Sequence, residues 1–340
     1  MTSSAPIGAF AIGDVSIPGR VLIAPMTGVS DLPFRQTAAR LGAAYVATEM
    51  VACEALAAGR PDVVRRAAVG EGLPLTVIQL VGRSPDQIAA GARTAEAAGA
   101  DLIDLNMGCP AKEVTGGLCG SALMRDLNLA EAIIRVAVDA TSRPVTLKMR
   151  LGWDDASRNA PELAARAQAA GVAAITVHGR TRQQFYKGAA DWRAVGLVKA
   201  EVDIPVIVNG DVVDAASAGE ALIQSGADAV MLGRGVYGRP WLAAALDRAL
   251  ASGAAMIEPE REERLAIALD HFRLSLGFYG EGLGLRMFRK HLGSYVEAAP
   301  WSSPDTRRGA KARLCRLDSP AEVERALTAL WRNEDLLAAA

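Results

Sequence analysis

The chain has 340 residues, which is enough for one large domain and a smaller one. Hydrophobic residues make up 51% of it and charged residues 22%, a composition that can bury a large core and excludes a disordered chain. The 37 basic residues nearly balance the 38 acidic ones, which excludes binding of nucleic acid through bulk positive charge but allows a local basic patch.

Eight short apolar runs, each ending at a polar or Gly-rich turn, are typical of buried parallel strands. In chain order these runs are 21–26, 45–50, 75–80, 102–107, 144–149, 174–178, 205–209 and 229–233. Ala-rich stretches with helical spacing fill most of the gaps. Ser84 begins a capping box (Ser-Pro-Asp-Gln) for one helix, and Pro161 lies near the start of another.

Eight such βα units predict an α/β fold, a (β/α)8 TIM barrel, over residues 1–250. A doubly wound open sheet is the alternative. Residues 7–20 precede the first strand and could form a small hairpin that closes the bottom of the barrel.

The pattern changes near residue 250, where a small-residue linker is followed by helical periodicity without a convincing strand. We therefore expect a smaller, all-helical C-terminal domain over residues 260–340. Residues 286–316 hold eight basic residues against two acidic ones, with Phe288, Tyr295 and Trp301 among them. This pattern suits an RNA backbone and stacked bases, although a solvated helix face is the alternative interpretation.

In a TIM barrel, function lies on the loops that follow the carboxyl ends of the strands. The residues at these positions, most of them polar or glycine, should therefore converge on one mouth. They are Pro25, Met26, Thr27, Glu49, Gln79, Asn106, Lys148, Arg150, His178, Arg180, Asn209, Gly210, Asp211, Gly233 and Arg234.

Residues 233–238 match the dinucleotide pattern GxGxxG. A Rossmann fold needs another strand after the helix and an acidic residue about 20 positions later, and the chain instead continues into the helical domain. We therefore interpret the glycines as the phosphate site that barrels often build after strands seven and eight, with Arg234 adding positive charge. A plain tight turn is the alternative.

Three further side chains suggest chemistry. Cys109 lies between Gly108 and Pro110, a setting that presents a thiol from a loop, where it could protonate a developing carbanion; a small buried hydrophobe is the alternative. Lys148 and His178 end consecutive strands, and a cation there could stabilise a reduced flavin. The four cysteines form no CxxC pair and the three histidines have no zinc spacing, so we expect no metal site.

Six segments resemble the bacterial tRNA-dihydrouridine synthases, and within them the dihydrouridine synthase B branch. They are APMTGVSD (24–31), NMGCPAK (106–112), LKMRLGW (147–153), HGRT (178–181), NGD (209–211) and GRG (233–235). The resemblance runs from about residue 20 to residue 245. It implies an FMN-containing oxidoreductase that uses NADPH to reduce the C5–C6 double bond of particular tRNA uridines.

The resemblance also implies roles for individual residues. Cys109 would protonate uracil C5 after flavin N5 gives a hydride to C6. Substrate contacts would come from Asn106, Arg150, Arg180, Arg286, Arg289 and Lys290. The FMN contacts would be Pro25, Met26, Thr27, Gln79, Lys148, His178, Asn209, Gly210, Asp211, Gly233 and Arg234. Glu113, Cys119 and Ser294 depart from the pattern of the family.

Two other functions remain open. One is an FMN barrel reductase of a free pyrimidine or another small enone, and the other is an RNA-binding regulator without catalysis. A small-molecule reductase has no obvious use for a basic helical domain, so we favour the tRNA enzyme. We also expect a cytoplasmic protein, because no uncharged apolar run reaches the ~18–20 residues of a membrane span and the first residues lack a secretory signal. We expect it to be a monomer.

Overall fold

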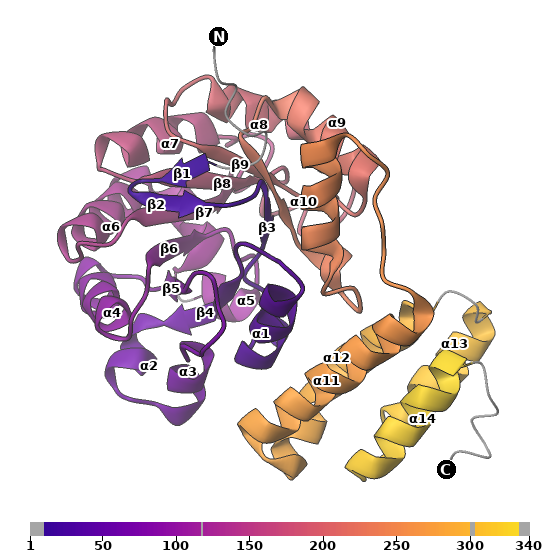
Figure 1. Ribbon diagram of the computed structural model, residues 1–340. Helices are drawn as coiled ribbons and strands as arrows, with labels where there is room; N and C mark the ends of the chain where they lie inside the picture. Colours follow the sequence, from indigo (N-terminus) through magenta and orange to yellow (C-terminus); the bar gives the residue numbers. More distant parts are fainter. Residues whose placement is uncertain (1–9, 117, 300–302, 333–340) are drawn as a thin grey trace.

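A closed barrel of eight parallel strands forms the larger part of the protein (Figure 1). The computed structural model describes residues 10–116, 118–299 and 303–332. The barrel strands are Val21–Ile23 (β3), Ala47–Ala52 (β4), Val77–Val81 (β5), Leu102–Met107 (β6), Val145–Arg150 (β7), Ala174–His178 (β8), Val206–Asn209 (β9) and Ala229–Leu232 (β10). Their order is β3-β10-β9-β8-β7-β6-β5-β4, and a bridge between Ile23 and Val46 closes the ring. The predicted strands and the TIM barrel are confirmed.

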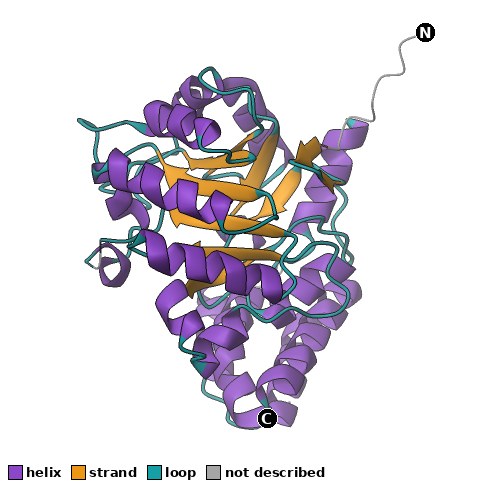
Figure 2. Ribbon diagram, turned by 90° about the vertical axis from the view of Figure 1, so that its left-hand side faces the viewer, coloured by secondary structure: helices purple, strands orange, loops and turns teal. Residues whose placement is uncertain are grey.

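Helices follow the strands along the chain and cover the outside of the barrel (Figure 2). They are Leu32–Arg40 (α1), Cys53–Ala57 (α2), Pro61–Arg66 (α3), Pro85–Ala97 (α4), Lys112–Thr115 (α5), Leu127–Asp139 (α6), Ala160–Ala169 (α7), Trp192–Lys199 (α8), Ala215–Ser225 (α9) and Leu242–Ser252 (α10), with short 3₁₀ helices at Gly120–Arg125 and Arg234–Val236. Ser84 caps α4 by accepting a hydrogen bond from the backbone N–H of Gln87, and Pro161 lies in the first turn of α7, as predicted. The Gln87 side chain accepts from Arg83, so the capping box lacks its usual reciprocal bond.

A hairpin closes the amino-terminal end of the barrel (Figure 1). Its two antiparallel strands are Phe10–Ile12 (β1) and Val15–Ile17 (β2). Gly13 makes the turn with a φ of +60°, which glycine adopts without strain. Ile12 and Ile17 are buried in one apolar cluster with Val77 and Leu102 at the first residues of their strands. The predicted hairpin is confirmed over its described part. Residues 7–9 of the prediction lie outside the described residues.

The described residues from 261 onward are helical, with no strand among them. The helices are Arg261–Tyr279 (α11), Glu281–Glu297 (α12), Pro304–Leu314 (α13) and Pro320–Arg332 (α14). They share an apolar core that contains Phe272, Phe288, Tyr295 and Trp331. Phe288 and Tyr295 are each only 1% exposed, so the expectation that they stack on RNA bases was wrong. Trp301 lies outside the described residues.

The helical region is fixed to the loop that follows β3. The Lys290 ammonium group donates a hydrogen bond to the backbone oxygen of Thr27 at 2.9 Å. The Tyr279 hydroxyl donates to Asp31 at 3.0 Å, and the His291 ring stacks on Phe34 with the ring centroids 5.6 Å apart. These contacts hold α11 and α12 at the end of the barrel where the strands finish. None of the helices in the described ranges combines the length and apolar character that crossing a bilayer requires.

The hairpin of β1 and β2 provides a test of the fold. Ile17 is fully buried, so Ile17→Ala removes apolar contacts and leaves a cavity, and we expect the free energy of unfolding to fall by about 2–5 kcal/mol. Ser16→Ala, on the exposed side of the same strand, should change it by less than ~0.5 kcal/mol. Urea unfolding followed by circular dichroism measures both. Equal effects of the two substitutions would mean that the hairpin does not seal the barrel.

Candidate functional site

Polar side chains from the neighbouring strands β5, β6 and β7 are joined by hydrogen bonds inside the barrel. Gln79 on β5 donates to one carboxylate oxygen of Asp104 at 2.6 Å, and Thr146 on β7 donates to the other at 2.7 Å. Burial raises the pKa of Asp104 to about 6. Asp104 was not among the predicted site residues, although its position two residues before Asn106 places both on the same face of β6.

Asn106 shapes the loop that carries Cys109. Its amide nitrogen donates to Gln79 at 2.8 Å, and its oxygen accepts from the backbone N–H groups of Gly108 and Cys109 at 3.2 and 3.0 Å. Ser121 holds the other side of the loop, because its hydroxyl and its backbone N–H both donate to the Cys109 oxygen. Cys109 is half-buried at the end of β6. Asn106, predicted to contact substrate, therefore also fixes the backbone that presents the thiol.

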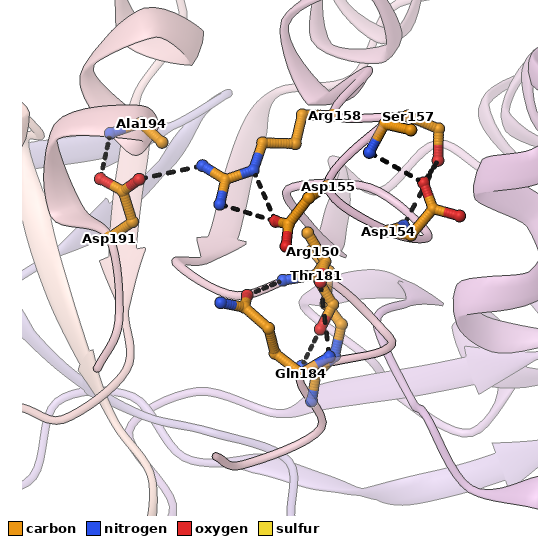
Figure 3. A network of polar contacts seen from close by, with 10 residues as sticks. Arg150, Asp154, Asp155, Ser157, Arg158, Thr181, Gln184, Asp191 and Ala194 are labelled. Carbon is orange, nitrogen blue, oxygen red and sulfur yellow. Dashed lines mark hydrogen bonds and ion pairs between the residues drawn. The ribbon is translucent and has the colours of Figure 1, made fainter. Parts of the chain in front are cut away.

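Arg150 joins this loop to the loop after β8. Its side chain is 1% exposed, and its Nε donates to the Gly108 oxygen at 2.7 Å. Its Nη1 donates to the backbone oxygens of Thr181 and Phe185, both at 2.9 Å; Figure 3 shows the side chain beside Thr181. Burial lowers the pKa of Arg150 to about 10, so the group stays charged at neutral pH.

Gly152 is the glycine of the segment LKMRLGW (147–153), and its surroundings show why glycine is needed there. A Cβ atom at this position would lie 2.0 Å from the backbone oxygen of Ser157, so only glycine fits there. The chain can then turn sharply after β7 and bring Trp153 onto the rim of the barrel.

Lys148 provides a positive charge in the mouth. Its ammonium group donates to the Asn209 amide oxygen at 3.1 Å, and the Asn209 nitrogen donates to the Met231 backbone oxygen at 2.7 Å. Burial and the neighbouring Arg150 lower the pKa of Lys148 to about 8, while Asp104 and Cys109 act in the opposite direction. Lys148 and Asn209, both predicted to contact a cofactor, are thus brought together.

His178 is the last residue of β8, and Arg180 lies two residues after it. Burial, with Arg150 and Lys148 adding repulsion, keeps the pKa of His178 well below its usual value, so the imidazole is uncharged at neutral pH. Arg180 lies 3.2 Å from His178 Nε2 and forms an ion pair with Asp211 at 2.6 Å. Arg180 also donates to the backbone oxygens of Lys187 and Gly188, which fixes the loop after β8.

The glycine loops after β9 and β10 lie beside these groups. Gly210 has a φ of +117°, and a Cβ atom there would lie 2.8 Å from the Cβ of Ala190. A Cβ atom at Gly233 would meet no atom within 4 Å, which means that open space lies next to this backbone. Arg234 follows with a side chain 55% exposed and its guanidinium 3.5 Å from Asp211.

Tyr186 is a mouth residue that sequence reasoning missed. Its ring is 47% exposed and lies beside two guanidinium groups, with its centroid 5.6 Å from the Arg150 carbon and 5.0 Å from that of Arg234. The available signal was its place in the loop after β8, next to another exposed aromatic residue, Phe185.

Three predicted substrate contacts, Arg286, Arg289 and Lys290, lie on α12 of the helical region and not on the barrel. Lys290 binds the Thr27 backbone, and Arg289 forms an ion pair with Asp318 at 2.8 Å. Arg286 is exposed one helical turn before Lys290. Pro25 and Met26 precede Thr27 in the loop that receives this helix.

Asp31, His271 and His291 meet where the helical region joins the barrel. Their possible ligand atoms all lie within 4.8 Å of one another, and within the described part of the chain neither histidine Nε2 has a hydrogen-bond partner. A zinc ion with ligands at 2.0–2.1 Å would bring these atoms to about 3.3 Å of one another. Burial lowers the pKa of His291 to about 3 and raises that of Asp31 to about 6. Both histidine rings pack on Phe34 at this junction, and His271 also contacts the ring of Phe288.

Comparisons with known proteins agree with this arrangement. The family model for dihydrouridine synthase (Dus) matches residues 22–315. A Rhodobacter capsulatus protein named "Probable tRNA-dihydrouridine synthase" is 52% identical over 303 residues, covering 88% of this chain and 91% of the relative. The tRNA-dihydrouridine synthase B of Xanthomonas campestris pv. campestris is 42% identical over 318 residues, covering 93% of this chain and 94% of the relative.

Solved structures with low sequence identity share the barrel. Morphinone reductase in complex with tetrahydroNAD matches with a TM-score of 0.51 and 18% identity, over 77% of this chain and 94% of that one. The 6-hydroxypseudooxynicotine amine oxidase of Pseudomonas geniculata matches with a TM-score of 0.56 and 13% identity, over 74% and 50% of the two chains. At these identities the likeness supports the fold alone. The match of the family model and the identity to curated relatives establish that this chain belongs to the dihydrouridine synthase family.

Proposed function

We propose that the protein is an FMN-dependent tRNA-dihydrouridine synthase that uses NADPH to reduce the C5–C6 double bond of specific tRNA uridines. The observation that carries this proposal is the loop of Cys109, held on both sides by hydrogen bonds at the end of β6, next to the charged groups of Lys148 and Arg150. Membership of the dihydrouridine synthase family supports the reaction class. We infer a monomer that acts in the cytoplasm, where its tRNA substrate is found.

The residues of the mouth suit FMN. The open space next to Gly233 leaves room for a group close to the backbone, and Arg234 supplies positive charge there for a phosphate. Lys148 offers an ammonium group for the negative charge of a reduced flavin. The proposed FMN contacts are Pro25, Met26, Thr27, Gln79, Lys148, His178, Asn209, Gly210, Asp211, Gly233 and Arg234.

In this proposal, FMN held by these residues and reduced by NADPH would supply the hydride that uracil C6 accepts. Cys109 donates the proton to C5, which completes 5,6-dihydrouridine and leaves a thiolate that solvent protonates again. Arg150 holds the Cys109 loop through the Gly108 oxygen. The uridine must leave its stack in the tRNA to reach these residues.

The helical region, residues 260–340, is proposed to bind tRNA beside the barrel domain, residues 1–250. Its attachment through Lys290 and Tyr279 to the loop after β3 places it next to the mouth. Arg286 is exposed, whereas Arg289 and Lys290 already bind groups of this chain. Arg180 and Asn106 are proposed to contact the uridine from the barrel.

The reaction itself can be tested with unmodified tRNA, FMN and NADPH. We expect the protein to form dihydrouridine, measured by mass spectrometry of digested tRNA. Cys109→Ala should lower the rate by about 10²–10⁴-fold, because it removes the general acid. Reduction of the bound flavin by NADPH should be unchanged in this variant.

Cys119→Ala is the matched control, since it removes a nearby thiol, and it should keep the activity of the parent. Dihydrouridine formation by Cys109→Ala at the parental rate would exclude Cys109 as the proton donor. No product from the parent, despite a flavin that NADPH reduces, would indicate a small-molecule reductase instead.

The pKa of Lys148 predicts how flavin binding depends on pH. Lys148 is charged below about pH 8 and loses its proton above it, so the affinity for FMN should fall about tenfold between pH 7 and pH 9.5. Lys148→Met should bind FMN weakly at pH 7 and lack this fall. Lys199→Met, which removes an ammonium group paired with Asp228 far from the mouth, is the control. Fluorescence titration of the apoprotein measures each affinity. An identical pH dependence in Lys148→Met and the parent would contradict the assignment.

A further inference from the structure

Two arginines and a tryptophan, Arg125, Arg182 and Trp153, form a cluster on the rim of the barrel outside the proposed catalytic site. The guanidinium carbon of Arg125 lies 4.9 Å from the ring centroid of Trp153, and that of Arg182 lies 4.7 Å from it. Arg125 comes from the loop after β6, Trp153 from the loop after β7 and Arg182 from the loop after β8. Two like charges are therefore held against one aromatic ring.

The loops that carry these side chains are tied together. The backbone N–H of Arg182 donates to the Gly152 oxygen at 2.9 Å, and that of Gln183 donates to the Trp153 oxygen at 3.0 Å. These bonds join the loops of Trp153 and Arg182, and the contacts of both guanidinium groups with the Trp153 ring place them side by side before any ligand binds. A ligand that accepts hydrogen bonds from them would lose less side-chain entropy than one that binds two freely moving arginines.

The acidic residues next to Trp153 in the sequence have other partners. Asp154 accepts from the Ser157 hydroxyl at 2.7 Å, and Asp155 forms an ion pair with Arg158 at 2.8 Å, as Figure 3 shows. Arg158 also binds Asp191 at 3.0 Å. Among the described residues, no carboxylate oxygen lies within 4.0 Å of the Arg125 guanidinium. Arg125 thus presents positive charge on the surface, where it is exposed, and Arg182 is half-buried beside it.

The position of the cluster indicates which anion it meets. Around the closed barrel, β7 lies four strands from β3 in either direction, so Trp153 is on the side of the mouth opposite the loop that holds the helical region. A polynucleotide that rests on the helical region and places one base in the mouth can continue across it to this rim. Planar guanidinium groups match the paired oxygens of a phosphate.

We propose that Arg125, Trp153 and Arg182 form a clamp for a backbone phosphate of RNA close to the extruded uridine. The inference rests on the proposed function, since it names a further contact of the same tRNA substrate. Trp153 positions the two guanidinium groups, and the arginines supply the charge. The clamp adds affinity for RNA and takes no part in the transfer of hydride or proton.

The test compares Arg125→Gln, Arg182→Gln and the double variant with the parent, in the flavin-loaded full chain. We expect the double variant to raise the KM for tRNA at least tenfold and to change kcat less than twofold. The slope of log Kd for tRNA against log salt should become shallower by about 0.7–0.9, because the loss of one phosphate contact means that fewer counterions are released on binding. The KM for NADPH should stay the same.

Two further variants separate charge from structure. Trp153→Leu keeps both arginines, so it should weaken tRNA binding while the salt slope stays near that of the parent. Arg143→Gln removes an exposed arginine that precedes β7 at the other end of the barrel, and it should change nothing. Flavin reduction by NADPH, measured without tRNA, reports whether each variant is folded.

The outcomes keep the two proposals apart. A double variant with the parental KM and salt slope would overturn the clamp while dihydrouridine formation by the parent supports the proposed function. A raised KM for NADPH with an unchanged salt slope would assign the cluster to the phosphates of the nucleotide and also overturn it. The salt slope for tRNA binding needs no turnover, so it tests the clamp even where the parent forms no dihydrouridine.

Discussion

A buried arginine holds the functional end of this barrel together. Arg150 is removed from water, and its fixed fork of donors reaches backbone oxygens in two different loops, at Gly108 on one side and at Thr181 and Phe185 on the other. A backbone oxygen buried without a donor costs roughly 1–3 kcal/mol, so the loss of this side chain would destabilise both loops. The thiol of Cys109 and the aromatic residue Tyr186 take their places from these loops.

The same constraint explains the charges of the mouth. Burial lowers the pKa of both Arg150 and Lys148, and the charge of Arg150 lowers the pKa of Lys148 further. Asp104 offsets part of that cost from inside the barrel, where Gln79 and Thr146 hold its carboxylate. His178 stays uncharged beside four cations, Lys148, Arg150, Arg180 and Arg234. The mouth therefore concentrates positive charge on rigid groups, which suits an anionic cofactor and a polynucleotide.

Much of this arrangement follows from local patterns in the sequence. The strands could be predicted because buried parallel strands are short apolar runs, and the mouth residues because each follows such a run. The helical region was harder, since a helix buries aromatic residues such as Phe288 and Tyr295 with the same spacing that a stacking surface would show. The contact of Lys290 with Thr27 and the arginine cluster at Trp153 join segments far apart in the chain, and no local pattern encodes them.

The account depends most on Arg150 as the residue that positions Cys109. The direct measurement is single-turnover reduction of tRNA uridine by the prereduced Arg150→Lys protein, which keeps the charge and loses the fork of donors. The account predicts that uridine reduction falls about 100-fold, since small misplacements of a catalytic group have effects of this size. Reduction of the flavin by NADPH should remain within about threefold of the parent. Uridine reduction at the parental rate, or an equal loss in both half-reactions, would contradict the account.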